Sequence, residues 1–267
     1  MSGRIRDAGK DDYIRWMLYA YPGHGKTSFI SSGAAEGLKI LLIRSPMDQI
    51  PKRALGTGMQ EWIVSSWEDM LEVQEYAQHE GSKWDWIWED CISVMQDVLL
   101  DDIWGATVAG KPHRDNLTPS GGLDRGEYGR NMERIKRHVR HMAGCRQFHY
   151  GITAHPFEAP HPANDEGGVV LQPYVQGKNM SQHICAIMNT VSFMEVKENE
   201  DQTKKWRRFY FAESERWYAK DQQDAFVEKG YADNLTLGKA TAALTGTAPK
   251  RGRATTTRRT TRQRREQ

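Results

Sequence analysis

The sequence has no long hydrophobic segment and little cysteine. No apolar run reaches the roughly 18 residues of a membrane-spanning helix, so we expect no membrane span. The first residues, MSGRIRDAGKDDYIRW, lack the apolar core of a secretory signal. The three cysteines, Cys91, Cys145 and Cys185, lie far apart and fit neither a disulfide framework nor a CxxC metal site. We therefore expect a protein of a reducing compartment, the cytoplasm.

Charge is distributed unevenly along the chain. Residues 249–267 contain seven Arg, one Lys and one Glu, a net charge of +7, whereas the whole chain carries +2. This segment has almost no apolar side chains and cannot bury a core. We expect residues 236–267 to form a basic, disordered tail, in which 249–267 binds phosphates of nucleic acid, single-stranded DNA above all, without reading sequence. The alternative is a tail that only increases solubility.

Hydrophobic patterning predicts one α/β domain over residues 13–235, after a flexible N-terminus at 1–12. Short apolar runs alternate with amphipathic segments, which favours a mostly parallel sheet flanked by helices. The expected strands are 14–20, 39–44, 61–66, 84–90 and 146–155, and the expected helices are 27–37, 67–80, 91–104, 127–144 and 178–189. Later strands at 190–196, 206–212 and 216–220 add antiparallel edge strands, the first two joined as a hairpin. We expect loops at 105–126 and 156–173.

The segment AYPGHGKT, residues 20–27, carries the sharpest motif. It matches the phosphate-binding pattern G-x-x-x-x-G-K-[ST] with Ala in the first position, between an apolar strand and a helix. Backbone N–H groups of such a loop and the helix N-terminus bind anions. We expect Lys26 to reach the β- and γ-phosphates of ATP and Thr27 to bind Mg²⁺. The expected nucleotide-binding residues are Ala20, Pro22, Gly23, His24, Gly25, Lys26, Thr27 and Ser28.

A second motif, WDWIWED at residues 84–90, ends in two acids. We expect Asp90, at a solvated strand tip, to hold the water shell of Mg²⁺ and to be required for turnover. The alternative is that Glu89 and Asp90 only cap the following helix. Strict alternation would place Trp84, Trp86 and Trp88 on one strand face, packed under a helix or, alternatively, stacked on bases.

Taken together, LYAYPGHGKTSF at 18–29, WDWIWEDCIS at 84–93, FHYGITAH at 148–155 and YAKD at 218–221 resemble a known family. They are similar to phage-encoded RecA-like P-loop ATPases, also called AAA-type ATP-binding proteins, some of which act in single-strand annealing or recombination. The resemblance implies a RecA-like core that binds ATP with Mg²⁺, with Asp90 as the Walker B acid. It also implies that His155 is a sensor near the γ-phosphate. The alternative is that His155, which Pro156 follows, is only the first residue of a loop. In RecA-like homo-oligomers a cation from a neighbouring subunit often completes the ATP site, and Lys220 is our candidate for it.

The sequence departs from the family where a water-activating acid is expected. In the segment ILLIRSPMDQ, the residues at the end of the second strand are Arg44, Ser45 and Pro46, where the acid is expected. This leaves Asp48 or Glu89 as the candidate acid. The leading hypothesis is an ATPase that acts on DNA in phage recombination or replication. The alternatives are a nucleotide-dependent switch or assembly protein with little hydrolysis, and a small-molecule kinase.

Overall fold

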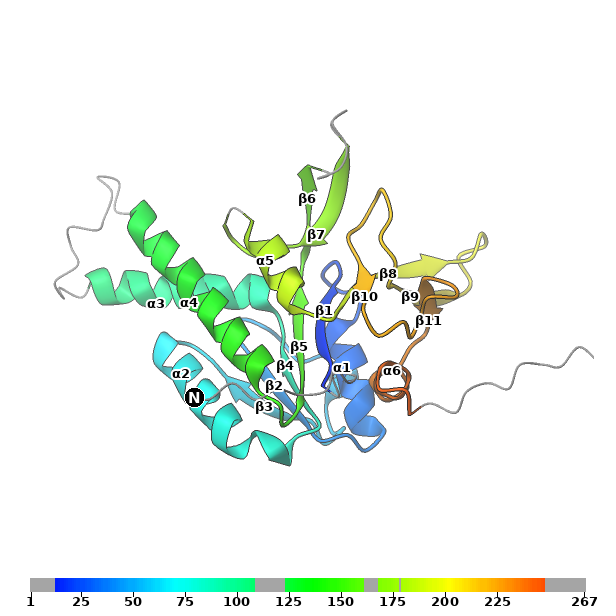
Figure 1. Ribbon diagram of the computed structural model, residues 1–267, viewed down its shortest axis with the longest axis horizontal. Helices are drawn as coiled ribbons and strands as arrows, with labels where there is room; N and C mark the ends of the chain where they lie inside the picture. Colours follow the sequence, from blue (N-terminus) through cyan, green and yellow to red (C-terminus); the bar gives the residue numbers. More distant parts are fainter. Residues whose placement is uncertain (1–12, 109–122, 161–167, 178, 248–267) are drawn as a thin grey trace, which may run out of the picture.

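The computed structural model describes residues 13–108, 123–160, 168–177 and 179–247 (Figure 1). The predictions for the N-terminus at 1–12 and for the basic segment 249–267 lie outside the described residues. None of the described helices combines the length and apolar character that crossing a bilayer requires.

A central sheet organises the molecule. Its strand order is β11-β9-β8-β1-β5-β4-β2-β3. Strand β10 lies outside this order and pairs with β8, which also pairs with β9. The parallel strands are β1 (Arg15–Tyr19), β2 (Ile40–Arg44), β3 (Gln60–Ile63), β4 (Trp86–Glu89), β5 (His149–Ala154) and β8 (Thr190–Glu198). Strands β9 (Lys205–Tyr210), β10 (Lys220–Asp221) and β11 (Tyr231–Asp233) add antiparallel pairs. The predicted α/β fold class is therefore confirmed, including the antiparallel strands near the C-terminus.

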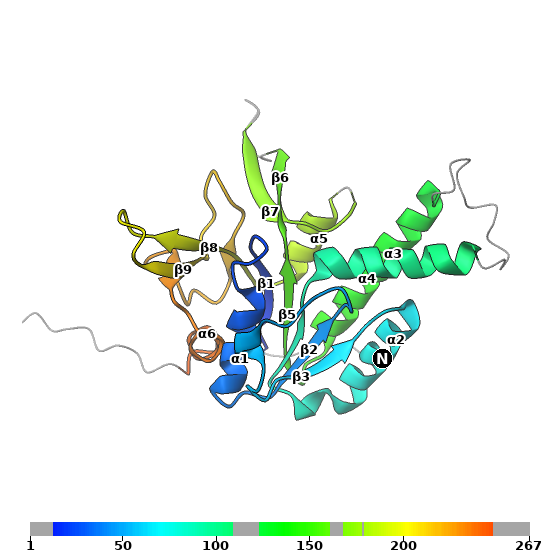
Figure 2. The same cartoon turned by 180° about the vertical axis from the view of Figure 1, so that it is seen from behind.

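Helices cover both faces of the sheet (Figures 1 and 2). One face packs on α1 (Lys26–Ala35) and α6 (Leu237–Leu244), and the other on α2 (Trp67–Glu80), α3 (Ile92–Val108), α4 (Arg125–Gly144) and α5 (Met180–Ile187). Side chains of β1 alternate between the two cores: Trp16 and Leu18 belong to the first, Met17 and Tyr19 to the second. Burial on both faces explains why β1, β2 and β4 are nearly continuous apolar runs. The connections that the structure describes include the 3₁₀ turns η1 (Lys52–Ala54) and η2 (Gly81–Lys83).

The expected loop at 156–173 contains a hairpin instead. Strands β6 (Pro156–Pro160) and β7 (Val169–Pro173) pair antiparallel as a separate two-stranded sheet, which extends away from the main sheet at the top of Figure 1. The hydroxyl of Tyr19 donates to the carbonyl of Leu171 (3.0 Å) and anchors its base. Proline-rich composition misled the prediction, because a two-stranded ribbon consists only of edges and tolerates proline.

The predicted boundary between domain and tail at residue 235 is also corrected. Helix α6 lies within the segment assigned to the tail, and Leu237, Ala240 and Leu244 are buried against the α1 side of the sheet. Thr236 caps this helix by accepting from the N–H of Lys239. Three apolar residues at helical spacing were enough to extend the packed core to Leu244.

The tryptophans of the second motif divide between the two faces. Trp86 and Trp88 are fully buried in the core beneath α1, which confirms packing rather than base stacking. Trp84 precedes β4 and packs against the opposite core, where its indole N–H donates to the hydroxyl of Tyr76 (3.2 Å). The prediction that Trp84 shares a face with Trp86 and Trp88 was wrong, because the strand begins only at Trp86.

Candidate functional site

The loop between β1 and α1 is held in a tight curve. The N–H of Ala20 donates to the carbonyl of Ala154 in β5 (3.2 Å), and the N–H of His24 donates to the carbonyl of Tyr21 (3.2 Å). Gly25 occupies the left-handed region (φ 95°) directly before the first residue of α1. Glycine adopts this conformation without the penalty that a side chain imposes. The loop therefore turns into a helix N-terminus whose free N–H groups can bind an anion.

Lys26 lies inside this loop. Its side chain is only 7% exposed, and its ammonium group donates to the carbonyl of Ala20 (2.9 Å). Burial lowers the pKa of Lys26, against the opposing effects of Cys91, Asp90 and Asp48. Burial and the charge of Lys26 also lower the pKa of His24, which favours a neutral imidazole there. An anion stabilises a positive charge that is partly removed from water, so the loop is suited to bind phosphate.

A cavity of about 700 Å³ opens beside the loop. The loop residues Gly23, Gly25, Lys26, Thr27 and Ser28 form one wall, with Arg207 against Gly25, and residues 49–53 form the other. Of the other predicted nucleotide-binding residues, Ala20 is buried at the strand end, Pro22 is exposed and His24 is half-buried. The sequence motif and the cavity therefore coincide, and the opposite wall adds residues that the motif did not include.

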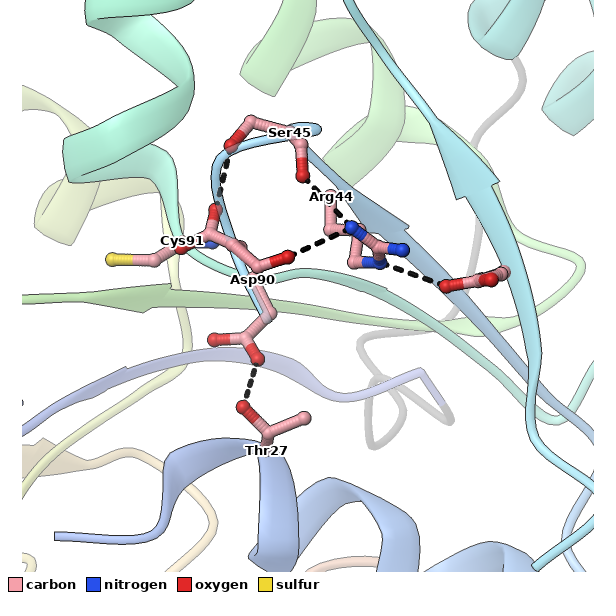
Figure 3. A network of polar contacts seen from close by, with 7 residues as sticks. Thr27, Arg44, Ser45, Asp90 and Cys91 are labelled. Carbon is pink, nitrogen blue, oxygen red and sulfur yellow. Dashed lines mark hydrogen bonds and ion pairs between the residues drawn. The ribbon is translucent and has the colours of Figure 1, made fainter. Parts of the chain in front are cut away.

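Asp90 lies directly opposite Thr27 (Figure 3). The Thr27 hydroxyl donates to one carboxylate oxygen of Asp90 (2.5 Å), and the Thr153 hydroxyl, from β5, donates to the other. Asp90 is only 6% exposed, so the expectation of a solvated strand tip was wrong. The hydroxyl and the carboxylate are oxygen groups of the kind that bind Mg²⁺ together with phosphate, and they fit that ion.

Asp48 lies beside Asp90 although it follows a different strand. Arg44 holds the intervening turn, since one guanidinium nitrogen donates to the carbonyls of Ser45 (3.1 Å) and Asp48 (2.8 Å). The carboxylate of Asp48 accepts from the Ser45 hydroxyl (2.9 Å) and weakly from the N–H of Cys91 (3.4 Å). Burial is the main cause that raises the pKa of Asp48, and the charge of Asp90 raises it further. A carboxylate with a raised pKa is a better proton acceptor.

Glu89, the other candidate acid, lies on the face of β4 opposite to that of Trp86 and Trp88. It is fully buried and accepts from the Tyr150 hydroxyl (2.6 Å), while the Nε2 atom of His138 lies 2.6 Å from the same carboxylate oxygen. Nδ1 of His138 contacts the side-chain amide of Gln74 (3.0 Å). Glu89 thus connects β4 to α2 and α4 within the core, away from the Thr27–Asp90 pair.

We expect Glu89→Ala to lower the free energy of unfolding by about 3 kcal/mol, because it leaves the buried Tyr150 and His138 without their acceptor. Denaturant unfolding measures this change. The matched control is Glu133→Ala on the exposed face of α4, where loss of a surface ion pair with Arg137 costs less than about 1 kcal/mol. Normal stability combined with lost nucleotide turnover in Glu89→Ala would instead assign Glu89 to the chemistry.

His155 directly follows β5, the strand between β1 and β4. The backbone N–H of His155 donates to the hydroxyl of Ser93 (2.9 Å), and this hydroxyl donates to the carbonyl of Tyr174 (2.7 Å). Burial, followed by the positive charge of Lys26, lowers the pKa of His155, whereas Asp90 raises it. The charges of Lys26 and Asp90 therefore both affect the imidazole, and the sensor role of His155 stays a prediction.

Lys220 lies elsewhere. It pairs through β10 with Val191, and Val191 also faces Met17 in the middle of β1 rather than its carboxyl end. Lys220 is not among the residues that line the cavity beside the loop. Burial lowers the pKa of Lys220, whereas the neighbouring Cys185 raises it. Within this chain the sheet does not bring Lys220 to the phosphate loop.

Two site residues escaped the sequence analysis. Thr153 was hidden inside an apolar strand, and its only signal was a hydroxyl two residues before the predicted sensor His155. Arg207 is distant in sequence but reaches Gly25. The signal in the sequence was a charged residue at a position that shares a strand face with Phe209, where an apolar residue is expected.

These features define a P-loop nucleotide-binding protein, in which strand tips from β1, β4 and β5 meet at one edge of a parallel sheet. A family model described as an AAA domain (AAA_24) matches residues 12–222, and the chain belongs to this AAA-domain family. The AAA-type P-loop domain predicted from the sequence is thereby confirmed. No curated protein gave a significant match.

The chain is also similar to solved structures at low identity. A RadB recombinase is 11% identical over 74% of this chain and 79% of its own, with a TM-score of 0.41. A KaiC-like protein from Pyrococcus horikoshii is 12% identical over 74% and 78%, with a TM-score of 0.38. The flagellar accessory protein FlaH from Methanocaldococcus jannaschii is 10% identical over 84% and 90%, with a TM-score of 0.37.

Proposed function

We propose that this protein is a RecA-like ATPase that binds ATP with Mg²⁺ at the 20–28 loop and hydrolyses it. One observation carries the proposal: Asp48 and Asp90, from the ends of adjacent strands, lie together next to Lys26 and Thr27. This arrangement supplies a cation for phosphate, an oxygen pair for the metal and a separate acid for water. The separate acid favours hydrolysis over a switch that only binds nucleotide.

Each group has a distinct part in the proposed reaction. The loop N–H groups and Lys26 hold the phosphate chain, and Thr27 with Asp90 holds Mg²⁺, which when bound neutralises phosphate charge. Asp48 orients the attacking water and accepts its proton. Thr153 keeps the carboxylate of Asp90 in position, and neutral His155 hydrogen-bonds the terminal phosphate. Lys220 would act only across a subunit boundary, and that role stays a prediction.

The test is phosphate release from ATP by the purified full-length chain. We expect turnover that requires Mg²⁺, disappears on chelation by EDTA and is measured with and without single-stranded DNA. Tight ATP binding without release of phosphate would favour the nucleotide-dependent switch. Transfer of the phosphate to an added small-molecule acceptor, rather than to water, would favour a kinase.

We further propose that the protein acts on DNA through residues 249–267. Seven arginines separated by Thr, Gln and Gly form a polycation that neutralises phosphates on any sequence. Assignment to phage recombination or single-strand annealing and a homo-oligomeric state stay predictions from the resemblance, and the cytoplasmic location stays a prediction from the cysteine content.

We expect a protein that ends after Ala248 to bind single-stranded DNA more weakly and with less salt dependence. If four or five charges contact phosphates, the slope of log K against log salt decreases by roughly 3. Titrations at several salt concentrations measure it, and unchanged ATP binding is the control for folding. If the shortened protein keeps the salt slope of the full-length protein, the DNA contact lies in residues before 249. The basic helix α4 is then the next candidate.

A further inference from the structure

Arg207 lies over the phosphate loop although it comes from the antiparallel part of the sheet. Strand β8 runs beside β1, with Phe193 facing Tyr19, and then continues past the end of β1. In this overhang Val196 pairs with Arg207 of β9. Because alternate residues of a strand share a face, Arg207 lies on the same face of β9 as Phe209, which packs against α1.

The guanidinium group of Arg207 is in close contact with the loop itself. A Cβ atom at Gly25 would lie 2.8 Å from Nε and from one terminal nitrogen of Arg207. The absence of a side chain at Gly25 therefore allows the guanidinium to lie against the backbone that turns into α1. Arg207 and Lys26 line the same cavity.

A second cationic segment lines the same cavity as Arg207. Lys52 and Arg53, on η1, belong to the wall opposite the loop. Burial lowers the pKa of Arg207, and the charge of Arg53 lowers it further. Within the part of the chain that the structure describes, no acidic side chain forms an ion pair with Arg207.

A half-buried cation beside another cation, with no carboxylate to neutralise it, is unfavourable unless an anion binds between them. Guanidinium groups match phosphate oxygens with two parallel hydrogen bonds. Lys26, Thr27 and Ser28 line this cavity but Asp90 and His155 do not, so the cavity adjoins the Thr27–Asp90 pair on the side of Thr27. The ligand chemistry that fits is a phosphate chain extending from the loop toward Arg207 and Arg53.

We propose that Arg207 is a phosphate-binding residue of the nucleotide site, supplied within the same chain by β9 and placed against Gly25. The inference rests on the proposed function, because it adds a second cation to the same site. It differs from the role expected for Lys220, which would require a neighbouring subunit.

The experiment compares Arg207→Gln with Arg208→Gln in the full-length protein. Arg208 is the matched control because it is next in sequence, faces the other side of β9 and makes an exposed two-bond ion pair with Asp233 (2.7 and 2.8 Å). Two probes are titrated in the presence of Mg²⁺: ATP and inorganic tripolyphosphate, which has the phosphates without the nucleoside. Thermal unfolding without ligand shows whether each variant is folded.

We expect Arg207→Gln to weaken binding of both probes by about 10- to 100-fold, the usual effect of losing hydrogen bonds to a charged ligand. Arg208→Gln should change either affinity by less than about threefold. Arg207→Lys, which keeps the charge but not the planar fork, should fall between wild type and Arg207→Gln. Without ligand, Arg207→Gln should unfold at the wild-type temperature or above it, because the repulsion from Arg53 is removed.

The outcomes separate this inference from the proposed function. Wild-type affinity for tripolyphosphate in a folded Arg207→Gln variant overturns the inference and leaves the ATPase proposal standing. Loss of ATP binding with normal tripolyphosphate binding also overturns it, because Arg207 would then contact the nucleoside. Arg207-dependent tripolyphosphate binding in a wild-type protein that does not hydrolyse ATP supports the inference and refutes the proposed hydrolysis.

Discussion

Lys26→Ala is expected to reduce ATP affinity by at least about 100-fold, because several charge-assisted hydrogen bonds to phosphate are lost together. Lys26 is the cation enclosed by the 20–27 loop, and its ammonium group is already held at the carbonyl of Ala20. Equilibrium titration with a fluorescent ATP analogue measures the change. Binding of the analogue with wild-type affinity would remove the loop from the nucleotide site.

The loss should not be accompanied by unfolding. Burial lowers the pKa of Lys26, which means that the folded protein bears a cost for keeping this charge. Lys26→Ala should therefore have a free energy of unfolding, measured without nucleotide, at or above that of wild type. Lys83→Ala is the control, since Lys83 on η2 forms an exposed ion pair with Glu80 at the end of α2, and it should leave ATP affinity unchanged.

Asp48→Asn is expected to reduce ATP turnover by about 100-fold or more while changing ATP affinity little, the usual effect of removing a general base. Glu89→Gln provides the matched comparison, because it neutralises the other candidate acid while keeping its shape. We expect Glu89→Gln to retain turnover. Loss of turnover in Glu89→Gln with normal turnover in Asp48→Asn would reverse the assignment.

The same assignment predicts a pH dependence. Asp48 must be ionised to accept a proton, and burial with the nearby Asp90 raises its pKa above the ordinary aspartate value of about 3.9. Wild-type turnover should therefore fall as pH decreases, with a midpoint above that ordinary value. A pH profile measured at saturating ATP tests this, and ATP binding followed in parallel distinguishes lost chemistry from lost affinity.

Sequence alone predicted the parallel part of the fold well because its signals are local. Each buried strand is a short apolar run, and the phosphate loop is a contiguous motif between a strand and a helix. The hairpin β6–β7 and helix α6 were missed because proline content and a polar C-terminal composition outweighed a few apolar residues whose partners lie far away in sequence.

The site shows the same division between local and distant information. Lys26 and Thr27 are adjacent in sequence and were assigned together. The choice between Asp48 and Glu89 could not be made from the sequence, because it depends on the turn that Arg44 holds after β2 and on which face of β4 each acid shares. Arg207 reaches Gly25 only through the register of three strands, β1, β8 and β9.

Helix α6 determines where the chain can be shortened without damage to the nucleotide site. The N–H of Leu237 donates to the hydroxyl of Ser32 in α1 (2.9 Å), and a Cβ atom at Gly33 would lie 2.9 Å from the side chain of Leu237. A protein cut at residue 235 would lose this support behind the P-loop helix and would expose the side of Trp86 that contacts Thr241. Weak ATP binding by such a fragment would report a damaged core and would be mistaken for a contribution of the arginine-rich segment, whereas a cut after Ala248 separates the two.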